Sequence, residues 1–258
     1  MASNRVQGTD MQNFIIVGTQ RTGSSAFAEA LGRHPEVVCG AEWLNHVHGS
    51  RKAAVASLAF AGHLQFIKRP RFELWRAALQ PEARWLGFRW LFRANGLWAV
   101  HPRYNPTLWL DGLESCMAWL AKRPDIHVIH VVRRDAVDWL KSKYLSRATM
   151  SYWGKSYPVS TKVRIPLREA RARVQSKEWI DRRLGDLRRS NPYHAIQYEA
   201  FLKDDAAVVA RALTFLGCDP ARQLRGDRRL RRQSTGTPAD YILNYAELSR
   251  SLAQQQPV

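Results

Sequence analysis

The 258-residue sequence contains little cysteine and no long apolar run. Its three cysteines, Cys39, Cys116 and Cys218, are widely spaced and form no CxxC pair, which argues against a disulfide framework and against a zinc site. No run reaches the roughly 18 apolar residues of a membrane span, and residues 1–10 are polar, without the apolar core of a signal peptide. These absences predict a cytoplasmic, soluble protein in a reducing compartment.

Acidic residues are scarce as well: 22 Asp and Glu stand against 40 Lys and Arg, which gives a formal net charge of +18. Much of the surplus lies between Arg164 and Arg232, where 17 basic residues accompany 9 acidic ones. Such a surplus attracts nucleotides, acidic glycans, an anionic membrane surface or nucleic acid. A solvated basic surface without such a partner is the alternative. The apolar fraction of 45% and the 10 Trp indicate a folded protein.

Short apolar runs and helical patterns alternate along the chain. Strands are predicted at Phe14–Val17, Ile126–Val132 and Tyr193–Tyr198, and helices over Ser25–Gly32, Ala136–Leu145 and Ala206–Leu216. This alternation predicts a three-layer α/β fold in which a parallel central sheet carries helices on both faces. Because no linker is recognisable, residues 1–258 are expected to form one domain with a flexible N-terminus at 1–12.

Two segments do not fit the alternation. Residues 46–81 are rich in His, Arg and aromatics, and residues 151–166 mix Tyr, Trp, Gly and Pro. Segments that decorate a fixed sheet commonly bind the substrate. We therefore expect 46–81 and 151–166 to be acceptor-binding insertions or a lid.

The segment Gly18–Ser25 reads GxxxxG followed by two serines, between a predicted strand and a predicted helix. Backbone N–H groups and a helix N-terminus form a concave anion site in such a loop, and the glycines permit the tight turn. A triphosphate-binding loop requires Lys after the second Gly. Here Ser24 takes that place, and the cation is Arg21, three positions earlier. The pattern predicts a P-loop-like nucleotide site; a plain strand-to-helix turn is the alternative.

The loop residues also resemble a known family. Arg21-Thr22-Gly23-Ser24-Ser25 resembles the 5′-phosphosulfate loop of sulfotransferases that use 3′-phosphoadenosine 5′-phosphosulfate (PAPS). The segments 33–37 and 40–44 are similar to the bacterial carbohydrate branch, such as nodulation-factor and trehalose sulfotransferases. The resemblance implies transfer of a sulfuryl group from PAPS, without a metal, to a hydroxyl of a carbohydrate, glycolipid or natural product. It assigns donor contacts to Arg21, Thr22, Gly23, Ser24 and Ser25.

A donor with a 3′-phosphate needs a second anion clamp. In this family the clamp is an Arg at a strand end and a Ser eight residues later, a spacing that Arg134 and Ser142 match. Eight residues span about 12 Å in a regular helix, so Arg134 must precede the helix if both side chains are to meet one phosphate. Arg133 is the adjacent alternative, and a surface pair of arginines at a strand end is the non-functional one.

The resemblance extends toward the C-terminus. Tyr198 matches a tyrosine that approaches adenine, with core packing as its alternative role. The segment 231–234 is similar to the basic closing loop of the family, which assigns donor contacts to Arg232, Gln233 and Ser234. This loop lacks the Arg-Lys-Gly triplet of the animal cytosolic enzymes. The segment 242–245 is similar to the start of the final helix.

Sulfuryl transfer needs a cation at the departing phosphate and a base at the acceptor hydroxyl. Arg21 would supply the charge, assisted by the backbone amides of the loop. Glu42 is the leading candidate for the base because it matches a catalytic glutamate of the bacterial carbohydrate enzymes; a salt-bridged surface carboxylate is its alternative role. His46 and His48 are the other candidates, since an imidazole titrates near neutral pH. His34 is expected to pack near the first helix.

Two other functions remain as alternatives. A P-loop-type small-molecule kinase would need the missing lysine and a magnesium ligand, for which Asp135 is a weak candidate. A non-catalytic polyanion or nucleic-acid binder would fit the charge, but no RNP, zinc-finger or basic-zipper signature is present.

The acceptor is expected to be a hydroxylated small molecule or glycan. An anionic membrane surface, contacted through the basic face, and a second copy of the chain are further possible partners, and specific nucleic-acid binding is not expected. Five tryptophans can either stack on sugars or lie in the core: Trp75, Trp85, Trp90, Trp98 and Trp109.

Overall fold

The computed structural model describes residues 12–39, 82–92, 107–151, 156–158, 160–222, 224–226 and 233–254. The described strands are β1 (Gln12–Thr19), β2 (Val37–Cys39), β3 (Trp85–Phe92), β4 (His127–Val132) and β5 (Tyr193–Gln197). The helices are α1 (Ser24–Leu31), α4 (Thr107–Ala121), α5 (Ala136–Ala148), α6 (Leu167–Gly185), α7 (Tyr198–Lys203), α8 (Asp205–Phe215), α9 (Pro238–Tyr241) and α10 (Tyr245–Ala253), with a short 3-10 helix at Asp186–Arg189.

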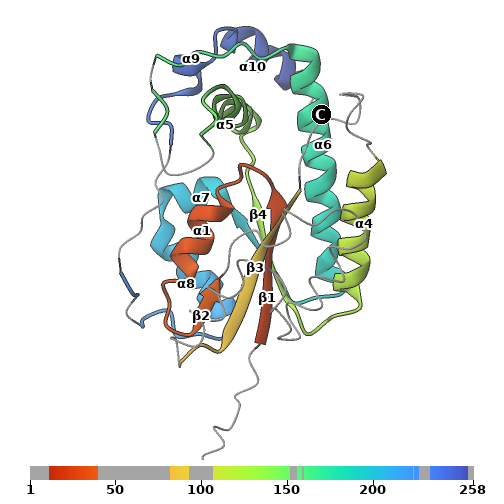
Figure 1. Cartoon of the computed structure of the whole chain (residues 1–258), viewed down its shortest axis with the longest axis vertical. Coiled ribbons are helices and arrows are strands. Elements are labelled where there is room, and N and C mark those ends of the chain that lie inside the picture. Colours follow the sequence, from red (N-terminus) through yellow and green to blue (C-terminus); the bar gives the residue numbers. More distant parts are fainter. Residues whose placement is uncertain are drawn as a thin grey trace, which may run out of the picture.

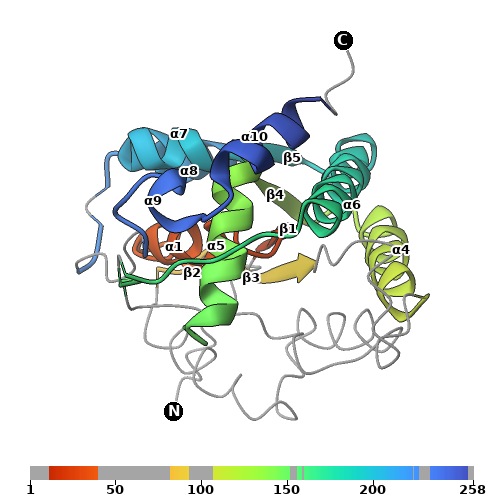
Figure 2. The same cartoon turned by 90° about the horizontal axis from the view of Figure 1, so that it is seen from above.

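The five strands form one sheet in the order β2-β3-β1-β4-β5, and every neighbouring pair is parallel. Helices α1, α7 and α8 cover one face, and α4 and α6 cover the other (Figure 1). Helices α5, α9 and α10 lie beyond the carboxyl ends of the strands (Figures 1 and 2). The predicted three-layer α/β fold with a parallel sheet is therefore confirmed.

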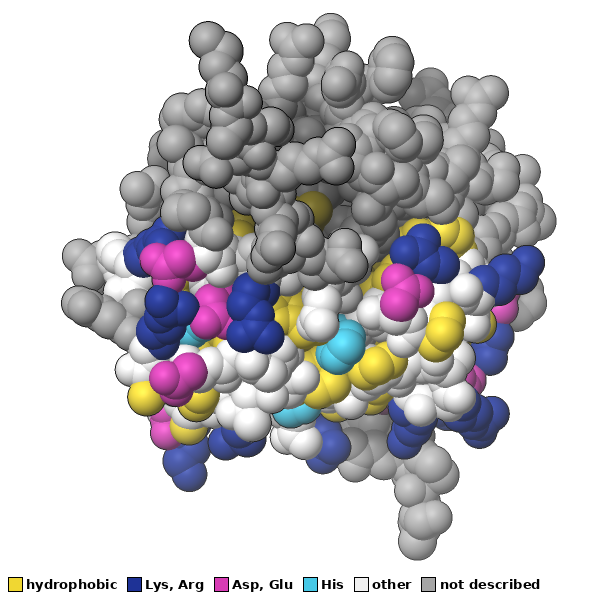
Figure 3. Space-filling view, turned by 90° about the horizontal axis from the view of Figure 1, so that it is seen from below, with side chains coloured by type: hydrophobic (Ala, Val, Ile, Leu, Met, Phe, Trp, Pro, Cys, Tyr) yellow, Lys and Arg dark blue, Asp and Glu magenta, His cyan; other side chains and the backbone are white. Residues whose placement is uncertain are grey.

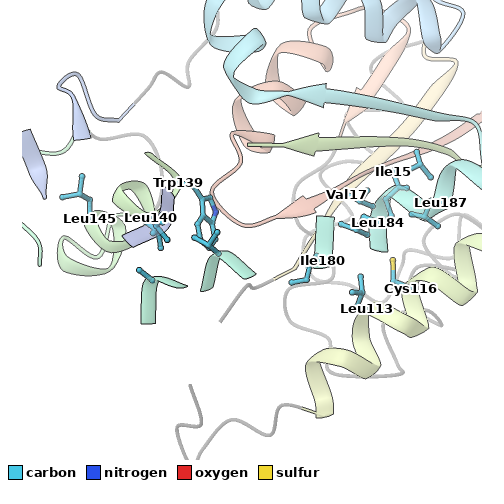
Figure 4. Close-up of a cluster of buried hydrophobic side chains, with 14 of the residues drawn as sticks. Ile15, Val17, Leu113, Cys116, Trp139, Leu140, Leu145, Ile180, Leu184 and Leu187 are labelled. Carbon is cyan, nitrogen blue, oxygen red and sulfur yellow. The ribbon is translucent and has the colours of Figure 1, made fainter. Parts of the chain in front are cut away.

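The central strand β1 explains why the sheet is buried on both faces. Its residues Phe14–Val17 are fully buried, as a central parallel strand requires. Ile15 and Val17 face the layer of α4 and α6, where they belong to the same apolar cluster as Leu113 and Leu184 (Figure 4). Phe14 and Ile16 belong to the opposite cluster, with α1 and α8.

Strand β3 was not predicted, because a glycine and an arginine interrupt its otherwise apolar sequence. It carries a glycine and a buried arginine, Gly87 and Arg89. A Cβ at Gly87 would overlap the ring of Phe14, so only glycine permits this close approach between neighbouring strands. Trp85 is 2% exposed and packs edge-on against Phe14, which places it in the core. Trp90 lies in β3.

Helix α6 was also missed, because charged residues dominate its sequence. Two of its cations are nonetheless buried, and each has an ion pair one turn away: Arg173 with Glu169 and Lys177 with Asp181. Pairing at this spacing lets a charge-rich helix pack against the sheet. Within the described ranges, no helix combines the length and apolar character that crossing a membrane requires.

Residues 160–166, the last part of the predicted acceptor-binding insertion or lid 151–166, are anchored to the C-terminal part of the chain. Val163 forms an isolated parallel bridge with Ile242, and the backbone N of Leu243 donates to the Val163 carbonyl at 2.9 Å. Both Val163 and Ile242 are buried. Residues 46–81, the other predicted insertion, lie outside the described residues together with Trp75 and Trp98.

Candidate phosphate-binding site

The loop between β1 and α1 has the tight backbone that an anion site requires. Arg21 and Gly23 adopt left-handed backbone conformations, with φ of 69° and 80°. A Cβ at Gly18 would lie 2.6 Å from the Val131 carbonyl oxygen, so the first residue of the loop packs directly against the backbone of β4. The hydroxyl of Thr22 donates to the Thr19 carbonyl at 2.9 Å. Since the N-cap of α1 is Gly23, which has no side chain, the first N–H groups of the helix are left for an anion.

The guanidinium of Arg21 brings together three segments that are far apart in sequence. Its Nε donates to the Ser142 hydroxyl of α5 at 3.1 Å. Its Nη2 donates to the Tyr157 hydroxyl at 2.8 Å and to Oε1 of Gln233 at 2.6 Å. Three predicted site residues, Arg21, Ser142 and Gln233, are therefore in direct contact. The predicted lid segment contributes Tyr157, which the sequence did not single out.

Tyr157 links the lid segment to the C-terminal segment as well as to Arg21. Its hydroxyl lies 3.0 Å from Oε1 of Gln233, and its backbone N donates to the Gln233 carbonyl at 2.7 Å. Burial raises the pKa of Tyr157, although the nearby charge of Arg21 acts in the opposite direction. The phenol therefore stays protonated at neutral pH, so it can donate to Gln233 while accepting from Arg21. This geometry makes Tyr157 a support for the Arg21 side chain.

Replacing Tyr157 by Phe should lower kcat roughly tenfold with little change in fold, because a hydrogen bond to a charged group is worth about 1.5–3 kcal/mol. The ring that fills the core is kept, and Arg21 loses one of its acceptors. Steady-state turnover and thermal unfolding of the variant would check this. Tyr245→Phe, on a partly exposed tyrosine of α10, is the matched control. Unchanged turnover in the Tyr157→Phe variant would show that this hydroxyl does not support Arg21.

The two arginines that follow β4 differ sharply in their surroundings. Arg133 is 3% exposed; its Nη1 donates to the Arg21 carbonyl at 2.8 Å, and its Nη2 donates to the Asp138 carbonyl at 3.0 Å. It also forms an ion pair with the Asp138 carboxylate. Arg134 is exposed. Arg133 therefore holds the loop backbone, and contact of the exposed Arg134 with a ligand phosphate stays a prediction.

A buried charge network supports the loop. Asp138 pairs with Arg133 and, at 2.5 Å, with the fully buried Lys141. Burial alone would raise the pKa of Asp138, but the two cations outweigh burial and lower the pKa to about 2. At neutral pH the three groups together carry one net positive charge beneath the phosphate loop. This charge favours an anion at the loop.

Tyr198 follows β5 and packs against the loop from the side. A Cβ at Gly23 would overlap the Tyr198 ring, so the ring lies directly against the glycine backbone. The Arg133 guanidinium lies 4.4 Å from the ring centroid on the ring face, a cation–π arrangement. Tyr198 is 8% exposed. Its observed contacts are those of a packing residue, and its contact with adenine stays a prediction.

Arg89 of β3 is a third cation at the loop, and sequence reasoning missed it. It is 7% exposed, and its Nη1 donates to the Ser25 hydroxyl at the start of α1. A charged residue inside an otherwise apolar strand was the available signal. Ser24 is likewise buried, at 3% exposure. The loop thus contains Arg21 and is contacted by Arg89 of β3 and by Arg133, which follows β4.

Several predicted residues cannot be placed. Glu42, His46, His48 and Arg232 lie outside the described part of the chain, so the base and part of the closing loop stay predictions. Ser234, next to Gln233, is buried at 6% exposure.

His34 lies just beyond α1 and is fully buried, as expected. Its Nε2 lies 3.0 Å from the Asp219 carbonyl, and its Nδ1 accepts from the backbone N of Glu36 at 3.2 Å. Glu36 and Cys218 lie close enough to share a metal with His34. However, both ring nitrogens already have backbone partners, and Glu36 forms ion pairs with Arg84 and Arg222. These contacts fit a structural cluster better than a cation site.

That cluster belongs to the face opposite the phosphate loop. On this face, seen from below in Figure 3, basic side chains lie beside acidic ones and form no continuous basic patch among the described residues. Arg222 and Arg225 both pair with Glu82 there. This arrangement offers a nucleic acid no uninterrupted basic surface on the described part of this face.

A parallel sheet, a glycine-rich turn into a helix and an arginine at that turn define an α/β protein with a P-loop-like phosphate site. A model of the sulfotransferase family matches residues 13–222, and the chain belongs to this family. The chain is similar to nodulation protein H of Rhizobium meliloti, with 25% identity over 238 residues that cover 91% of this chain and 89% of that protein. Nodulation protein H of Rhizobium meliloti strain 1021 is 31% identical over 137 residues, covering 52% and 55% of the two chains.

Two solved structures are also similar along most of their length. A sulfotransferase from Alicyclobacillus acidocaldarius has 16% identity and a TM-score of 0.47, covering 94% of this chain and 93% of that one. The sulfotransferase domain of the Synechococcus PCC 7002 olefin synthase has 14% identity and a TM-score of 0.45, covering 96% of each chain.

Proposed function

We propose that this protein transfers the sulfuryl group of PAPS to a hydroxyl group of a carbohydrate, a glycolipid or a natural product. The observation that carries the proposal is the position of Arg21. Arg21 belongs to a GxxxxG loop that lacks the lysine of triphosphate-binding loops. Its guanidinium donates hydrogen bonds to Ser142 and Gln233, and the resemblance assigned both residues to donor binding. Membership of the sulfotransferase family supports the same reaction class.

Each half of the donor has residues suited to hold it. The first N–H groups of α1, with the hydroxyls of Ser24 and Ser25, suit the 5′-phosphosulfate. Arg134, exposed at the turn before α5, suits the 3′-phosphate together with Ser142. PAPS brings an activated sulfuryl group on a phosphate leaving group. Arg21 stabilises the negative charge that develops on that phosphate, and the buried charge of Arg133 and Lys141 adds to the field.

The residues proposed to bind and deprotonate the acceptor come from the sequence predictions. Glu42 is proposed as the base that takes the hydroxyl proton, with His46 and His48 as the alternatives. Residues 46–81 and 151–166 are proposed to bind the acceptor, and the contact between Tyr157 and Arg21 supports this for the second segment. Four further points stay predictions: a single domain over residues 1–258, a cytoplasmic location, contact with a membrane, and a homodimer.

Ligand binding separates this function from its rivals. Adenosine 3′,5′-bisphosphate should raise the melting temperature of the full chain, and ATP with magnesium should not. Labelled PAPS and a panel of sugars, glycolipids and hydroxylated metabolites should then yield a sulfated product. A response to ATP with magnesium alone would favour a kinase. Micromolar binding of nucleic acid without any response to the bisphosphate would favour a polyanion binder.

A further inference from the structure

Glu199 lies in the first turn of α7, directly after β5, and joins that helix to the turn that follows β4. Its Oε1 accepts from the backbone N of Arg134 at 2.9 Å and from the backbone N of Asp135 at 3.0 Å. Strands β4 and β5 are parallel, with Val132 opposite Gln197. The residues after the two strands therefore leave the sheet at the same edge. One carboxylate oxygen thus holds two consecutive N–H groups that lie more than sixty residues away in sequence.

These two bonds fix the backbone from which the Arg134 side chain leaves. Arg134 itself is exposed, so its direction depends on its backbone more than on packing. The fixed turn continues into α5, because the carboxylate of Asp135, the N-cap, accepts from the backbone N of Asp138 at 2.8 Å. Helix α5 carries Ser142. Both parts of the proposed 3′-phosphate clamp are therefore tied to the turn that Glu199 holds.

A simpler role for Glu199 is stabilisation of its own helix. A carboxylate in the first turn of α7 interacts favourably with the helix dipole. That role does not require hydrogen bonds to another element, and the bonds observed both go to the β4–α5 turn. A carboxylate near a phosphate also repels it, so its charge is a disadvantage at a clamp. The neighbouring Tyr198 packs against Arg133 and the phosphate loop.

We propose that Glu199 is a positioning residue that sets the preference of the site for nucleotides with a 3′-phosphate. It acts by holding the backbone of Arg134 and Asp135, and it need not touch the ligand. This inference rests on the proposed function, since it assumes that Arg134 binds the 3′-phosphate of the donor.

The preference can be measured as a ratio of two affinities. Isothermal titration of the full chain with adenosine 3′,5′-bisphosphate and with adenosine 5′-monophosphate gives this ratio for each variant. Glu199→Ala should lower the affinity for the bisphosphate about tenfold and change the affinity for the monophosphate by less than about twofold. Glu199→Gln should keep the wild-type ratio or raise it, because its amide oxygen still accepts both N–H groups without the repelling charge. Glu178→Ala, on an exposed glutamate of α6, controls for the loss of one negative charge.

Glu199→Asp provides a variant that keeps the charge. Its shorter side chain should lose the contact with the two N–H groups and show the same selective loss as alanine. If Glu199→Ala and Glu199→Asp leave the ratio of the two affinities at its wild-type value, the positioning role is wrong. If the wild-type protein itself does not prefer the bisphosphate, the proposed function fails, and this result is distinguishable from failure of the inference about Glu199.

Discussion

Arg21→Ala should reduce kcat about 1,000-fold, or about 4 kcal/mol in the activation free energy. Arg21 is the cation at the loop, and its guanidinium meets Ser142, Tyr157 and Gln233, so its removal takes away both the charge and the group that these residues orient. Its left-handed backbone conformation costs about 1 kcal/mol for a residue other than glycine, which is typical of a functional position. Single-turnover sulfuryl transfer from labelled PAPS would measure the loss.

Two variants make the Arg21 result specific. Arg168→Ala removes one exposed cation from the first turn of α6 and should leave turnover unchanged. Arg21→Lys keeps the charge but cannot reproduce the forked contacts, so it should fall between wild type and alanine. Retention of more than about a tenth of wild-type turnover in Arg21→Ala would remove Arg21 from the reaction, since such a residual rate is too high for loss of a main electrostatic contact.

Asp138→Ala should destabilise the fold by about 3–5 kcal/mol, because it leaves Arg133 and Lys141 as buried charges without their shared counterion. Urea denaturation gives the free energy of unfolding for both proteins. Asp186→Ala is the control: this carboxylate pairs with Arg183 and Arg189 but is about one-third exposed, so the change should cost about 1 kcal/mol or less. Similar losses in the two variants would contradict a special role for the buried network.

The same carboxylate makes a defined contribution to acid unfolding. The pKa of Asp138 is about 2 in the folded protein against an ordinary value of 3.8, so the unfolded chain takes up this proton more readily. The stabilisation is therefore fully present above about pH 4 and is lost as the pH falls toward 2; it amounts to about 2 kcal/mol. Between pH 6 and pH 3, the unfolding free energy of Asp138→Asn should fall less than that of the wild type. Parallel pH dependence in the two proteins would exclude this contribution.

The loop of the candidate site could be predicted because it is short and contiguous in sequence. The loop 18–25 lies between a strand and a helix that adjoin it in sequence, and the structure has the turn and the helix where they were expected. Ser142 and Gln233 came from the family resemblance, and the structure brings both to Arg21. The choice between Arg133 and Arg134 was left open by the sequence. Burial distinguishes the two, since Arg133 forms the internal ion pair and Arg134 is exposed.

The residues that sequence reasoning missed all act across long separations. Tyr157 reaches Arg21 from 136 positions away, and Arg89 reaches Ser25 from 64. Glu199 is bonded to a turn 65 positions earlier. No local pattern marks such contacts, because they depend on which strands become neighbours. Strand β3, which carries Arg89, lies between β1 and β2 and disrupts the simple order that consecutive strands suggest.

The sequence by itself determined the parallel α/β class and the phosphate loop, because a buried strand, a glycine turn and a helix start are all encoded within a few neighbouring residues. The tertiary structure alone decided which side chains meet at that loop. Parallel strands bring their carboxyl ends to one edge, so Arg21, Arg133 and Glu199 become neighbours there although they come from distant parts of the chain. Burial at that edge then decides which charges are paired internally and which stay exposed.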